Sequence, residues 1–202
     1  MPYAPEHKIK TRQRIINSAR SLFNQKGFNE VSIDEIMADA GLTRGGFYYH
    51  FRSKDALFTE AIETFKAPIE DKNSRYCIDQ EKLNQREIAH ALLDVYLSNM
   101  HLENVGLQCP MVALPSDISR SGPESREAYG SLMQRMSQVF KNAFTENSDE
   151  ERQEMALVLS SLCVGGMVLA RTIDNPHKSD AILDAAKKFG SRMIEGHFID
   201  SE

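Results

Sequence analysis

The residues with the clearest chemical character lie together between Thr43 and His50, in the stretch TRGGFYYH. An arginine is followed by two adjacent glycines, three adjacent aromatic rings and a histidine. Each glycine costs roughly 1 kcal/mol relative to alanine inside a helix, so the stretch is poorly suited to a helix that only packs. Small residues beside rings and hydrogen-bond donors suit a helix end that enters the major groove of DNA. We therefore expect a nucleic-acid contact surface here.

The spacing of the rings divides the stretch into a buried and an exposed side. Phe47 and Phe51 are four residues apart, so both can turn into the core. An ordinary packed helix with every ring in the core is the alternative, but exposed-type residues such as Tyr-Tyr-His are poor core material. The expected groove contacts are Thr43, Arg44, Gly45 and Tyr48. The expected phosphate contacts are Tyr49, His50, Lys54 and the basic residues of the preceding helix, Lys8, Lys10 and Arg12.

A second reactive candidate is Cys109, which is followed by Pro110 at an expected loop-to-helix junction. A helix N-terminus lowers a thiol pKa, and proline suits the first helical position. Cys109 is therefore an inert half-buried thiol, a sensor of oxidants or electrophiles, or a nucleophile with His101 or His90 as its base. Nothing in the sequence orients such a catalytic pair, and an enzyme would leave residues 43–50 unexplained. With no H-x-x-x-H or C-x-x-C spacing, we expect no metal and no cofactor.

The elements around residues 43–50 form a helix-turn-helix pattern. Ser32 with Glu35 three residues later is a capping box that starts one short helix, and Gly41 is a good stop for it. Thr43 can cap a second helix that runs to about Phe51, and two short helices joined by a tight turn are a helix-turn-helix. A helix from about residue 8 to 26 precedes them, and Ser53 begins a fourth helix.

These residues resemble the tetracycline-repressor (TetR) family of bacterial transcription regulators. The matching strings are ARSLFNQKGF, VSIDEIMADAGLT, GGFYYHF and SKDALF, within roughly residues 9–60. The remaining two thirds match only in being helical. The resemblance implies a homodimeric repressor whose C-terminal domain binds a small-molecule effector that releases it from a palindromic operator. The expected fold is all-α, with a three-helix DNA-binding domain at residues 1–58 and a helical-bundle effector-binding and dimerisation domain at residues 59–202.

The rest of the chain reads as further helices, over residues 84–101, 123–146, 150–172 and 179–196, with an apolar segment at 109–118. The helix at 150–172 carries no charge between Met155 and Ala170, so it must be covered on most sides, and we take it as too short to span a membrane. The last two helices are our candidates for a symmetric four-helix dimer interface. The alternative is that they only close the monomer core. The candidates are Val158, Leu162, Gly165, Gly166, Leu169, Ile182, Ala186, Phe189 and Met193.

An effector pocket between these helices would draw on their methionine-rich apolar residues, because such surfaces adapt to varied ligands. Taken singly, each is more readily explained as core. The candidates are Tyr96, Met100, His101, Cys109, Met111, Met133, Met136, Phe140, Cys163 and Met167.

Charge and composition place this chain among soluble intracellular proteins. The net charge is −5, but residues 1–58 carry nine Lys or Arg against six Asp or Glu, a net +3, which leaves −8 for the remainder. A basic end on an acidic body is typical of a DNA-binding domain attached to a regulatory one. Three widely spaced cysteines favour a reducing compartment, and the N-terminus lacks the apolar run of a signal peptide. We expect a cytoplasmic protein with no membrane contact.

Overall fold

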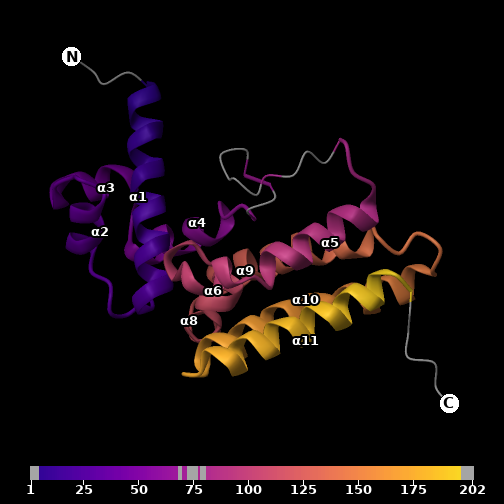
Figure 1. Ribbon diagram of the computed structural model, residues 1–202. Helices are drawn as coiled ribbons and strands as arrows, with labels where there is room; N and C mark the ends of the chain where they lie inside the picture. The colour runs from indigo at the N-terminus through magenta and orange to yellow at the C-terminus, as the bar shows by residue number, and fades with distance from the viewer. Residues whose placement is uncertain (1–4, 68–69, 72–76, 78–80, 197–202) are drawn as a thin grey trace. The chain divides into compact units, whose positions relative to one another are not determined.

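A computed structural model of the chain describes residues 5–67, 70–71, 77 and 81–196, and every regular element within these residues is a helix (Figure 1). The chain divides into two compact units. The first unit comprises residues 1–65 and 105–132, and the second comprises residues 66–104 and 133–202. The all-α expectation is confirmed. Each unit is described by itself below.

The N-terminal helices of the first unit pack around one long helix. They are α1 (Pro5–Lys26), α2 (Ile33–Asp39), the 3-10 helix η1 (Arg44–Gly46), α3 (Phe47–His50) and α4 (Lys54–Glu63). Figure 1 shows α2 and α3 beside α1. Phe23, Phe47 and Phe58 are fully buried, and Phe23 meets Phe58 edge-on at 5.2 Å between ring centroids. Aromatic burial therefore holds α1, α3 and α4 in one core.

The helix-turn-helix expectation holds in outline and fails in two details. The Ser32 hydroxyl caps α2 by accepting from the Glu35 amide at 3.1 Å, but the Glu35 carboxylate pairs with Lys26 and does not complete the capping box. Gly41 ends α2 with φ +66°, a conformation that glycine adopts without a steric penalty. The second helix is not one α-helix from Thr43 to Phe51. It begins as η1 and becomes α3 only at Phe47, because the adjacent glycines weaken an α-helix.

The first unit also contains a segment from the middle of the chain. This segment holds η2 (Val105–Leu107), α7 (Pro110–Ala113), α8 (Pro115–Ser119) and the first part of α9 (Pro123–Lys141). The Asn24 side chain donates to the Gln108 carbonyl at 2.7 Å. A Cβ on Gly106 would clash with the Ser21 hydroxyl oxygen, so η2 packs directly on α1. Residues 1–58, the expected DNA-binding domain, are thus part of a larger compact unit.

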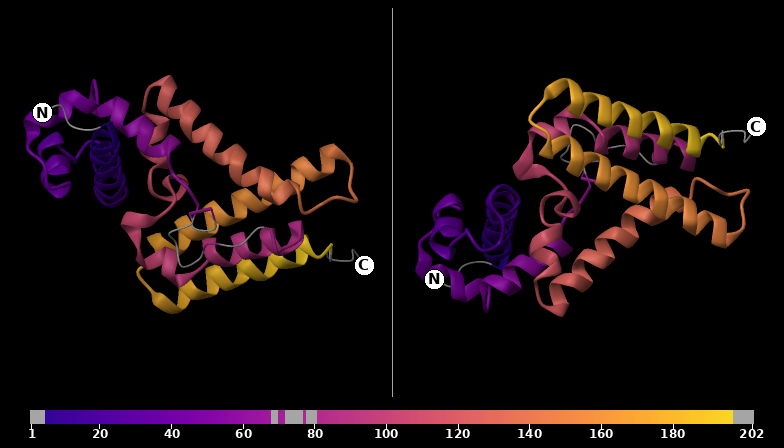
Figure 2. Two further views of the ribbon diagram at one scale, coloured as in Figure 1. Left: turned by 90° about the horizontal axis from the view of Figure 1, so that it is seen from above. Right: turned by 90° about the horizontal axis from the view of Figure 1, so that it is seen from below.

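The second unit is a bundle in which α5 (Gln85–Tyr96), α10 (Asp149–Thr172) and α11 (Pro176–Ile194) run side by side (Figure 2). Its other elements are α6 (Asn99–Glu103) and the rest of α9. The single helix expected over residues 84–101 is wrong: the chain breaks after Tyr96, and the Ser98 hydroxyl caps α6 by accepting from the His101 amide at 3.2 Å. The α9 helix also ends at Lys141, before the expected residue 146.

The length of α10 requires a correction. It has 24 residues, and its most apolar 18-residue window has a mean hydropathy of 1.7, so by length and composition it could cross a membrane. The expectation that it is too short was wrong. Within that window 44% of the residues are buried, and α10 packs against α5 and α11. The core helix of a soluble protein passes the same test of length and hydropathy.

Candidate nucleic-acid interface

The stretch from Thr43 to His50 separates into buried and exposed rings, as its spacing predicts. Phe47 and Phe51 are 0% and 3% exposed, whereas Tyr48 and Tyr49 are 63% and 67% exposed. Large exposed tyrosines with no covering element are uncommon in a protein that only packs. Both rings are therefore available to an external partner.

The residues before these rings leave an open surface at the start of the second helix. Thr43 has extended backbone angles, and its hydroxyl makes no capping bond. A Cβ on Gly45 would meet no atom within 4 Å, so a groove wall or base edge could approach the backbone at that position. Arg44 is exposed, and its Nη1 lies 2.5 Å from Asp34 Oδ2 on α2. Thr43, Arg44, Gly45 and Tyr48 are all exposed.

Three arginines of α1 donate hydrogen bonds to backbone carbonyls of the helices packed against it. Arg12 donates to the His50 carbonyl, Arg14 to the Ala40 carbonyl and Arg20 to the Ala61 carbonyl at 2.9 Å. These acceptors lie at the C-terminal ends of α3, α2 and α4, where carbonyl groups lack helical partners and the helix dipole favours a cation. One helix thus fixes the ends of three others. The sequence concealed this role because each acceptor is at least 26 residues away along the chain.

Arg12 and Lys54, two of the four cations expected on phosphates, have partners inside the unit. Arg12 also forms a two-bond ion pair with Glu60, and its guanidinium lies 4.0 Å from the Phe51 ring centroid. These bonds can hold Arg12 in position within the unit, and its contact with a phosphate stays a prediction. Lys54 donates to the carbonyls of Phe28 and Val31 at 2.8 and 2.9 Å, which leaves it one donor for a phosphate.

Lys8 and Lys10 remain on the outside. Lys8 lies 4.5 Å above the centroid of the Tyr49 ring, and Lys10 pairs with Glu6 at 2.8 Å while 73% of its side chain stays exposed. Surface ion pairs of this kind contribute little to stability and exchange readily.

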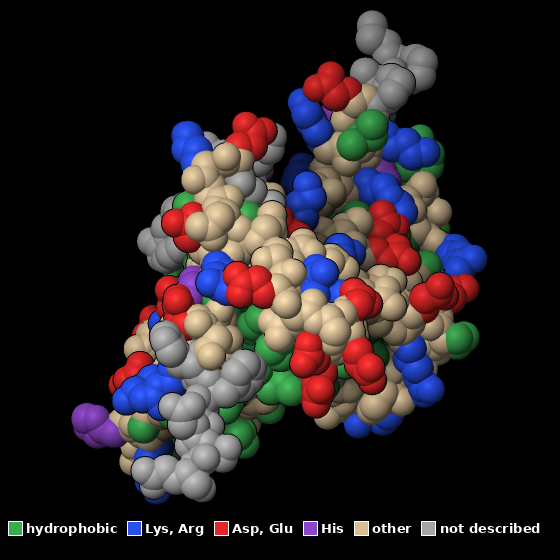
Figure 3. Space-filling model, turned by 90° about the vertical axis from the view of Figure 1, so that its right-hand side faces the viewer, with side chains coloured by type: hydrophobic (Ala, Val, Ile, Leu, Met, Phe, Trp, Pro, Cys, Tyr) green, Lys and Arg blue, Asp and Glu red, His purple; other side chains and the backbone are tan. Residues whose placement is uncertain are grey.

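Blue and red side chains both occur across the face drawn in Figure 3, so the net charge of −5 does not make that face uniformly negative.

His50 lies beside these cations. Burial, then the charges of Arg12 and Lys8, lower the pKa of His50. Its Nδ1 is buried without a hydrogen-bond partner. A neutral imidazole can still donate one hydrogen bond to a phosphate oxygen.

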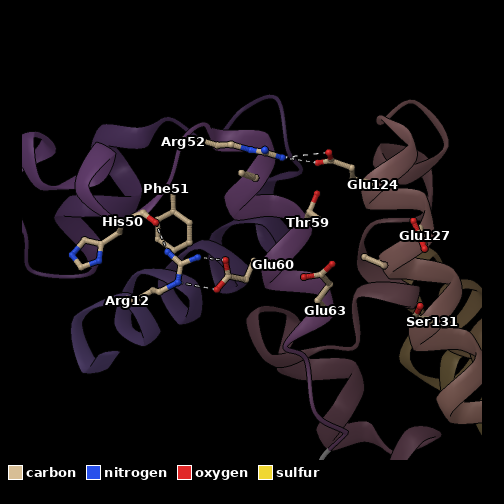
Figure 4. Close-up of a pocket in the computed structure, with 12 residues that line it drawn as sticks. Arg12, His50, Phe51, Arg52, Thr59, Glu60, Glu63, Glu124, Glu127 and Ser131 are labelled. Atoms are coloured by element: carbon tan, nitrogen blue, oxygen red, sulfur yellow. Dashed lines mark hydrogen bonds and ion pairs between the residues drawn. The ribbon is translucent and has the colours of Figure 1, made fainter. Parts of the chain in front are cut away.

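A polar cavity of about 640 Å³ opens in the first unit between α4 and the start of α9 (Figure 4). Arg12 and Glu60 form one ion pair in its wall, and Arg52 pairs with Glu124 at 3.1 Å across it. The Thr59 and Ser125 hydroxyls lie 2.8 Å apart. The Thr59–Ser125 contact joins α4 to α9, and the Arg52–Glu124 pair joins the residue two before α4 to the same helix. The ten residues expected to form an effector pocket contribute nothing to its lining.

Those ten residues do not form one site within either unit. Cys109 and Met111 belong to the first unit, and the other eight belong to the second. A second cavity, of about 520 Å³, is lined by residues of α5 and α11 and by none of the ten. Most of the ten are buried, as core residues would be; the buried members are Tyr96, His101, Cys109, Met111, Met136, Phe140, Cys163 and Met167, whereas Met100 and Met133 are half-buried.

Two of these residues form a local pair. The ring centroids of Tyr96 and His101 lie 4.8 Å apart, and His101 Nδ1 lies 2.7 Å from the Tyr96 carbonyl oxygen. Burial lowers the pKa of His101 against the opposing effect of this hydrogen bond. Burial likewise raises the pKa of the Cys163 thiol. Over the residues that the structure describes, no cluster of three or more His, Cys, Asp or Glu side chains could hold a metal ion.

The nine expected interface residues divide into an exposed and a buried group. Gly166, Ala186 and Met193 are buried, and a Cβ on Gly166 would lie 3.2 Å from the Ala186 Cβ. These three therefore pack in the core of the second unit. The outward-facing group is Val158, Leu162, Gly165, Leu169, Ile182 and Phe189, each exposed or half-buried. We call these six residues the α10/α11 ridge.

Comparison with known proteins places this geometry in a family. Residues 15–61 match the model described as bacterial regulatory proteins, tetR family. The chain is 51% identical over 49 residues to the transposon Tn10 TetC protein of Escherichia coli, which covers 24% of this chain and 25% of that protein. It is 25% identical over 186 residues to the HTH-type transcriptional regulator LmrA of Bacillus subtilis (strain 168), covering 88% of this chain and 97% of that protein.

The fold extends the likeness to most of the chain. A TetR transcriptional regulator from Chloroflexus aurantiacus J-10-fl superposes with a TM-score of 0.69 at 22% identity, covering 94% of this chain and 96% of that one. The first curated relatives are matched over only 43%, 25% and 31% of their own lengths, so the sequence likeness is concentrated in the N-terminal helices. Residues 15–61 thus form a helix-turn-helix domain of the tetR family of bacterial regulatory proteins, and the chain as a whole resembles transcriptional regulators of that family in sequence and fold.

Proposed function

We propose that the protein is a homodimeric transcriptional repressor that binds a palindromic DNA operator and is released by a small-molecule effector. Each subunit would place Thr43 to Tyr48 in a major groove, with the half-sites about one helical turn of DNA or more apart. Tyr49, His50, Lys8 and Lys10 would contact phosphates.

The observation that carries this proposal is the exposure of Tyr48 and Tyr49 beside the open backbone at Gly45. The ring of Tyr48 can contact a thymine methyl group and its hydroxyl can donate to a base or phosphate. Phe47 and Phe51 fill the core, so packing does not explain why the rings of Tyr48 and Tyr49 are exposed to solvent.

Dimerisation is supported by the α10/α11 ridge. Val158, Leu162, Gly165 and Leu169 recur at spacings of four, three and four along α10, which places them on one face. Leu169 is 57% exposed and Phe189 on α11 is 43% exposed. A second copy would cover these side chains in an isologous contact, in which the same two helices of each subunit form a four-helix bundle.

The effector would bind among the helices of the C-terminal region, and binding would favour a separation of the two DNA-binding domains that no longer fits the operator. A cytoplasmic location and the absence of enzymatic activity are part of the same proposal. Sensing of oxidants by Cys109 gains no support, because that thiol is only 3% exposed and reactive cysteines are partly accessible.

Binding of the purified protein to the DNA upstream of its own gene, measured by fluorescence anisotropy at several salt concentrations, tests the proposal. Tight, sequence-selective binding that weakens steeply with salt is the expected result. Tyr48→Ala should weaken this binding by about tenfold or more and leave the molecular mass in solution unchanged. Glu63→Gln, which alters an exposed residue of α4, is the matched control. Salt-independent or sequence-blind binding by the wild type would contradict the repressor assignment.

A further inference from the structure

The Asp117 carboxylate on α8 contacts the loop that leads from α1 into the helix-turn-helix. Its Oδ1 accepts a hydrogen bond from the Phe28 amide at 3.2 Å, and only 16% of the Asp117 side chain is exposed. The same carboxylate lies against Gly27, because a Cβ on that glycine would be 3.4 Å from Asp117 Oδ2. Gly27 follows the last residue of α1 with φ +82°, a conformation that favours glycine. Asp117 therefore meets the chain at the point where it turns out of α1.

Phe28 is also held at its carbonyl and its ring. Lys54, the first residue of α4, donates to the Phe28 carbonyl at 2.8 Å, and its ammonium lies 4.2 Å from the Phe28 ring centroid. The ring packs against two buried rings, one on α1 and one on α4. Asp117 and Lys54 thus bind the amide and the carbonyl of one residue in loop 27–31, which leads directly to Ser32, the cap of α2.

The position of Asp117 is itself well defined. Its neighbours on the buried side of this segment, Leu114 and Ile118, are 2% and 6% exposed, so α8 is anchored in the core of the first unit. Asp117 lies outside residues 15–61, which match the family model. The loop that enters the helix-turn-helix therefore depends on a residue from a later segment of the chain.

We propose that Asp117 is a positioning residue for DNA binding, whose bond to the Phe28 amide sets the direction in which the chain enters α2. The inference rests on the proposed DNA-binding function. A contact surface has to be held within about 0.5 Å of its productive geometry by the residues that support it. Without the bond to Asp117, loop 27–31 keeps its polar contact with Lys54 alone, and α2 can shift beneath the second helix.

The charge of Asp117 and its hydrogen bond act in opposite directions on DNA affinity, so the two can be separated. A carboxylate repels phosphates, and its removal alone should leave binding unchanged or slightly tighter. Asp117→Asn removes the charge and keeps an oxygen that can accept from the Phe28 amide, whereas Asp117→Ala removes both. Arg120 lies 3.9 Å from Asp117 Oδ1 and is 66% exposed, so its loss as a partner should matter little.

The test measures, by fluorescence anisotropy, binding to a duplex enriched from a random pool by the wild-type protein. Asp117→Ala should bind about three- to tenfold more weakly, as expected for one lost hydrogen bond. The slope of log affinity against log salt should stay within about 0.3 of the wild type, because no phosphate contact is lost. Asp117→Asn should bind as tightly as the wild type or more tightly. In hydrogen exchange, the Phe28 amide should exchange faster in Asp117→Ala than in Asp117→Asn.

Ser116→Ala, at the exposed neighbouring position on α8, is the matched control and should change neither DNA affinity nor exchange at Phe28. Each affinity is expressed per folded molecule, with the folded fraction taken from circular dichroism, so that a loss of stability is not counted as a loss of binding. An Asp117→Ala variant that binds like the wild type, or an Asp117→Asn variant as weak as Asp117→Ala, would overturn the inference alone. A wild-type protein that enriches no sequence would overturn the proposed function together with it.

Discussion

Arg12 on α1 and Glu60 on α4 form an ion pair with two hydrogen bonds, and the same guanidinium donates to the His50 carbonyl and lies over the Phe51 ring. Three helices therefore meet at one arginine. The side chains of Arg12 and Glu60 are 35% and 25% exposed, so the pair is partly removed from water. A cation held in this way fixes the end of α3 against α4.

Glu60→Gln should lower the free energy of unfolding by on the order of 1–3 kcal/mol, because it leaves the partly buried guanidinium without its carboxylate. Urea unfolding followed by circular dichroism measures the change. Glu63→Gln, one turn further along α4 and exposed, should change it by less than about 0.5 kcal/mol. Equal effects of the two substitutions would show that the Arg12–Glu60 bond does not hold the helices together.

The variant Arg12→Gln distinguishes a positioning role for Arg12 from a phosphate contact. If Arg12 held a phosphate, Arg12→Gln would reduce the salt slope of DNA binding by about 0.9. We expect the slope to stay within about 0.3 of the wild type while stability falls. A loss of slope with unchanged stability would return Arg12 to the list of DNA contacts.

Much of the N-terminal region is predictable from the sequence because its signals are local. Ser32, Gly41 and Ser53 mark helix ends through bonds or backbone angles that involve only neighbouring residues. The burial of Phe47 and Phe51 against the exposure of Tyr48 follows from helical spacing alone. The internal partners of Arg12 could not be predicted, because His50 and Glu60 lie 38 and 48 residues away and charge density at a helix start does not reveal a distant acceptor.

In the C-terminal helices, too, the sequence does not reveal contacts between residues that are far apart along the chain. The apolar run of α10 predicts burial but cannot say which face meets α11 and which faces outward. Gly166 was expected at the interface and is instead packed against Ala186 and Leu97. A Cβ on Gly165, its neighbour, would meet no atom within 4 Å, because one residue along a helix turns the side chain by about 100°.

Substitution of the α10/α11 ridge should disrupt the proposed homodimer. Leu169→Glu places a charge in a contact that should otherwise be apolar, and a buried unpaired carboxylate costs several kcal/mol. We expect sedimentation analysis to show monomers at micromolar concentration, with weaker operator binding. Gln134→Glu, an exposed position on α9, should leave the dimer intact. A Leu169→Glu variant that remains dimeric would show that the ridge is not the interface.

The reactivity of the three cysteines should follow their exposure. Cys77 is exposed, whereas Cys109 and Cys163 are buried. We expect a disulfide reagent such as dithionitrobenzoate to modify Cys77 rapidly in the folded protein, and the other two thiols only at the rate of opening or unfolding. Cys77→Ser should abolish the fast phase and Cys109→Ser should not. A fast phase that disappears with Cys109→Ser would revive the oxidant-sensor alternative.

Stability should decrease below neutral pH through His101. Burial lowers the pKa of His101 below its ordinary value of 6.5, so near that pH the unfolded chain binds a proton that the folded chain excludes. The free energy of unfolding contributed by this group is therefore fully present above about pH 6.5 and is lost as the pH falls toward the folded pKa. His101→Asn should reduce the difference in stability between about pH 7.5 and pH 5.5. His177→Asn, an exposed position on α11, should leave that difference unchanged, and equal pH profiles for the wild type and His101→Asn would contradict the assignment.

Two glycines in helix interiors should respond in opposite directions to alanine. A Cβ on Gly190 would lie 2.9 and 3.1 Å from the terminal carbons of Leu93 and 3.3 Å from one of Leu159, so α5, α10 and α11 approach each other closely at this point. Gly190→Ala should destabilise the protein by on the order of 1–3 kcal/mol, because the leucines must move to admit the methyl group. Gly130 on α9 has no atom within 4 Å of such a position, and Gly130→Ala should stabilise by about 0.5–1 kcal/mol through lower chain entropy in the unfolded state. Thermal and urea unfolding of the two variants measure both changes, and a stabilised Gly190→Ala would mean that the three helices pack less closely than described.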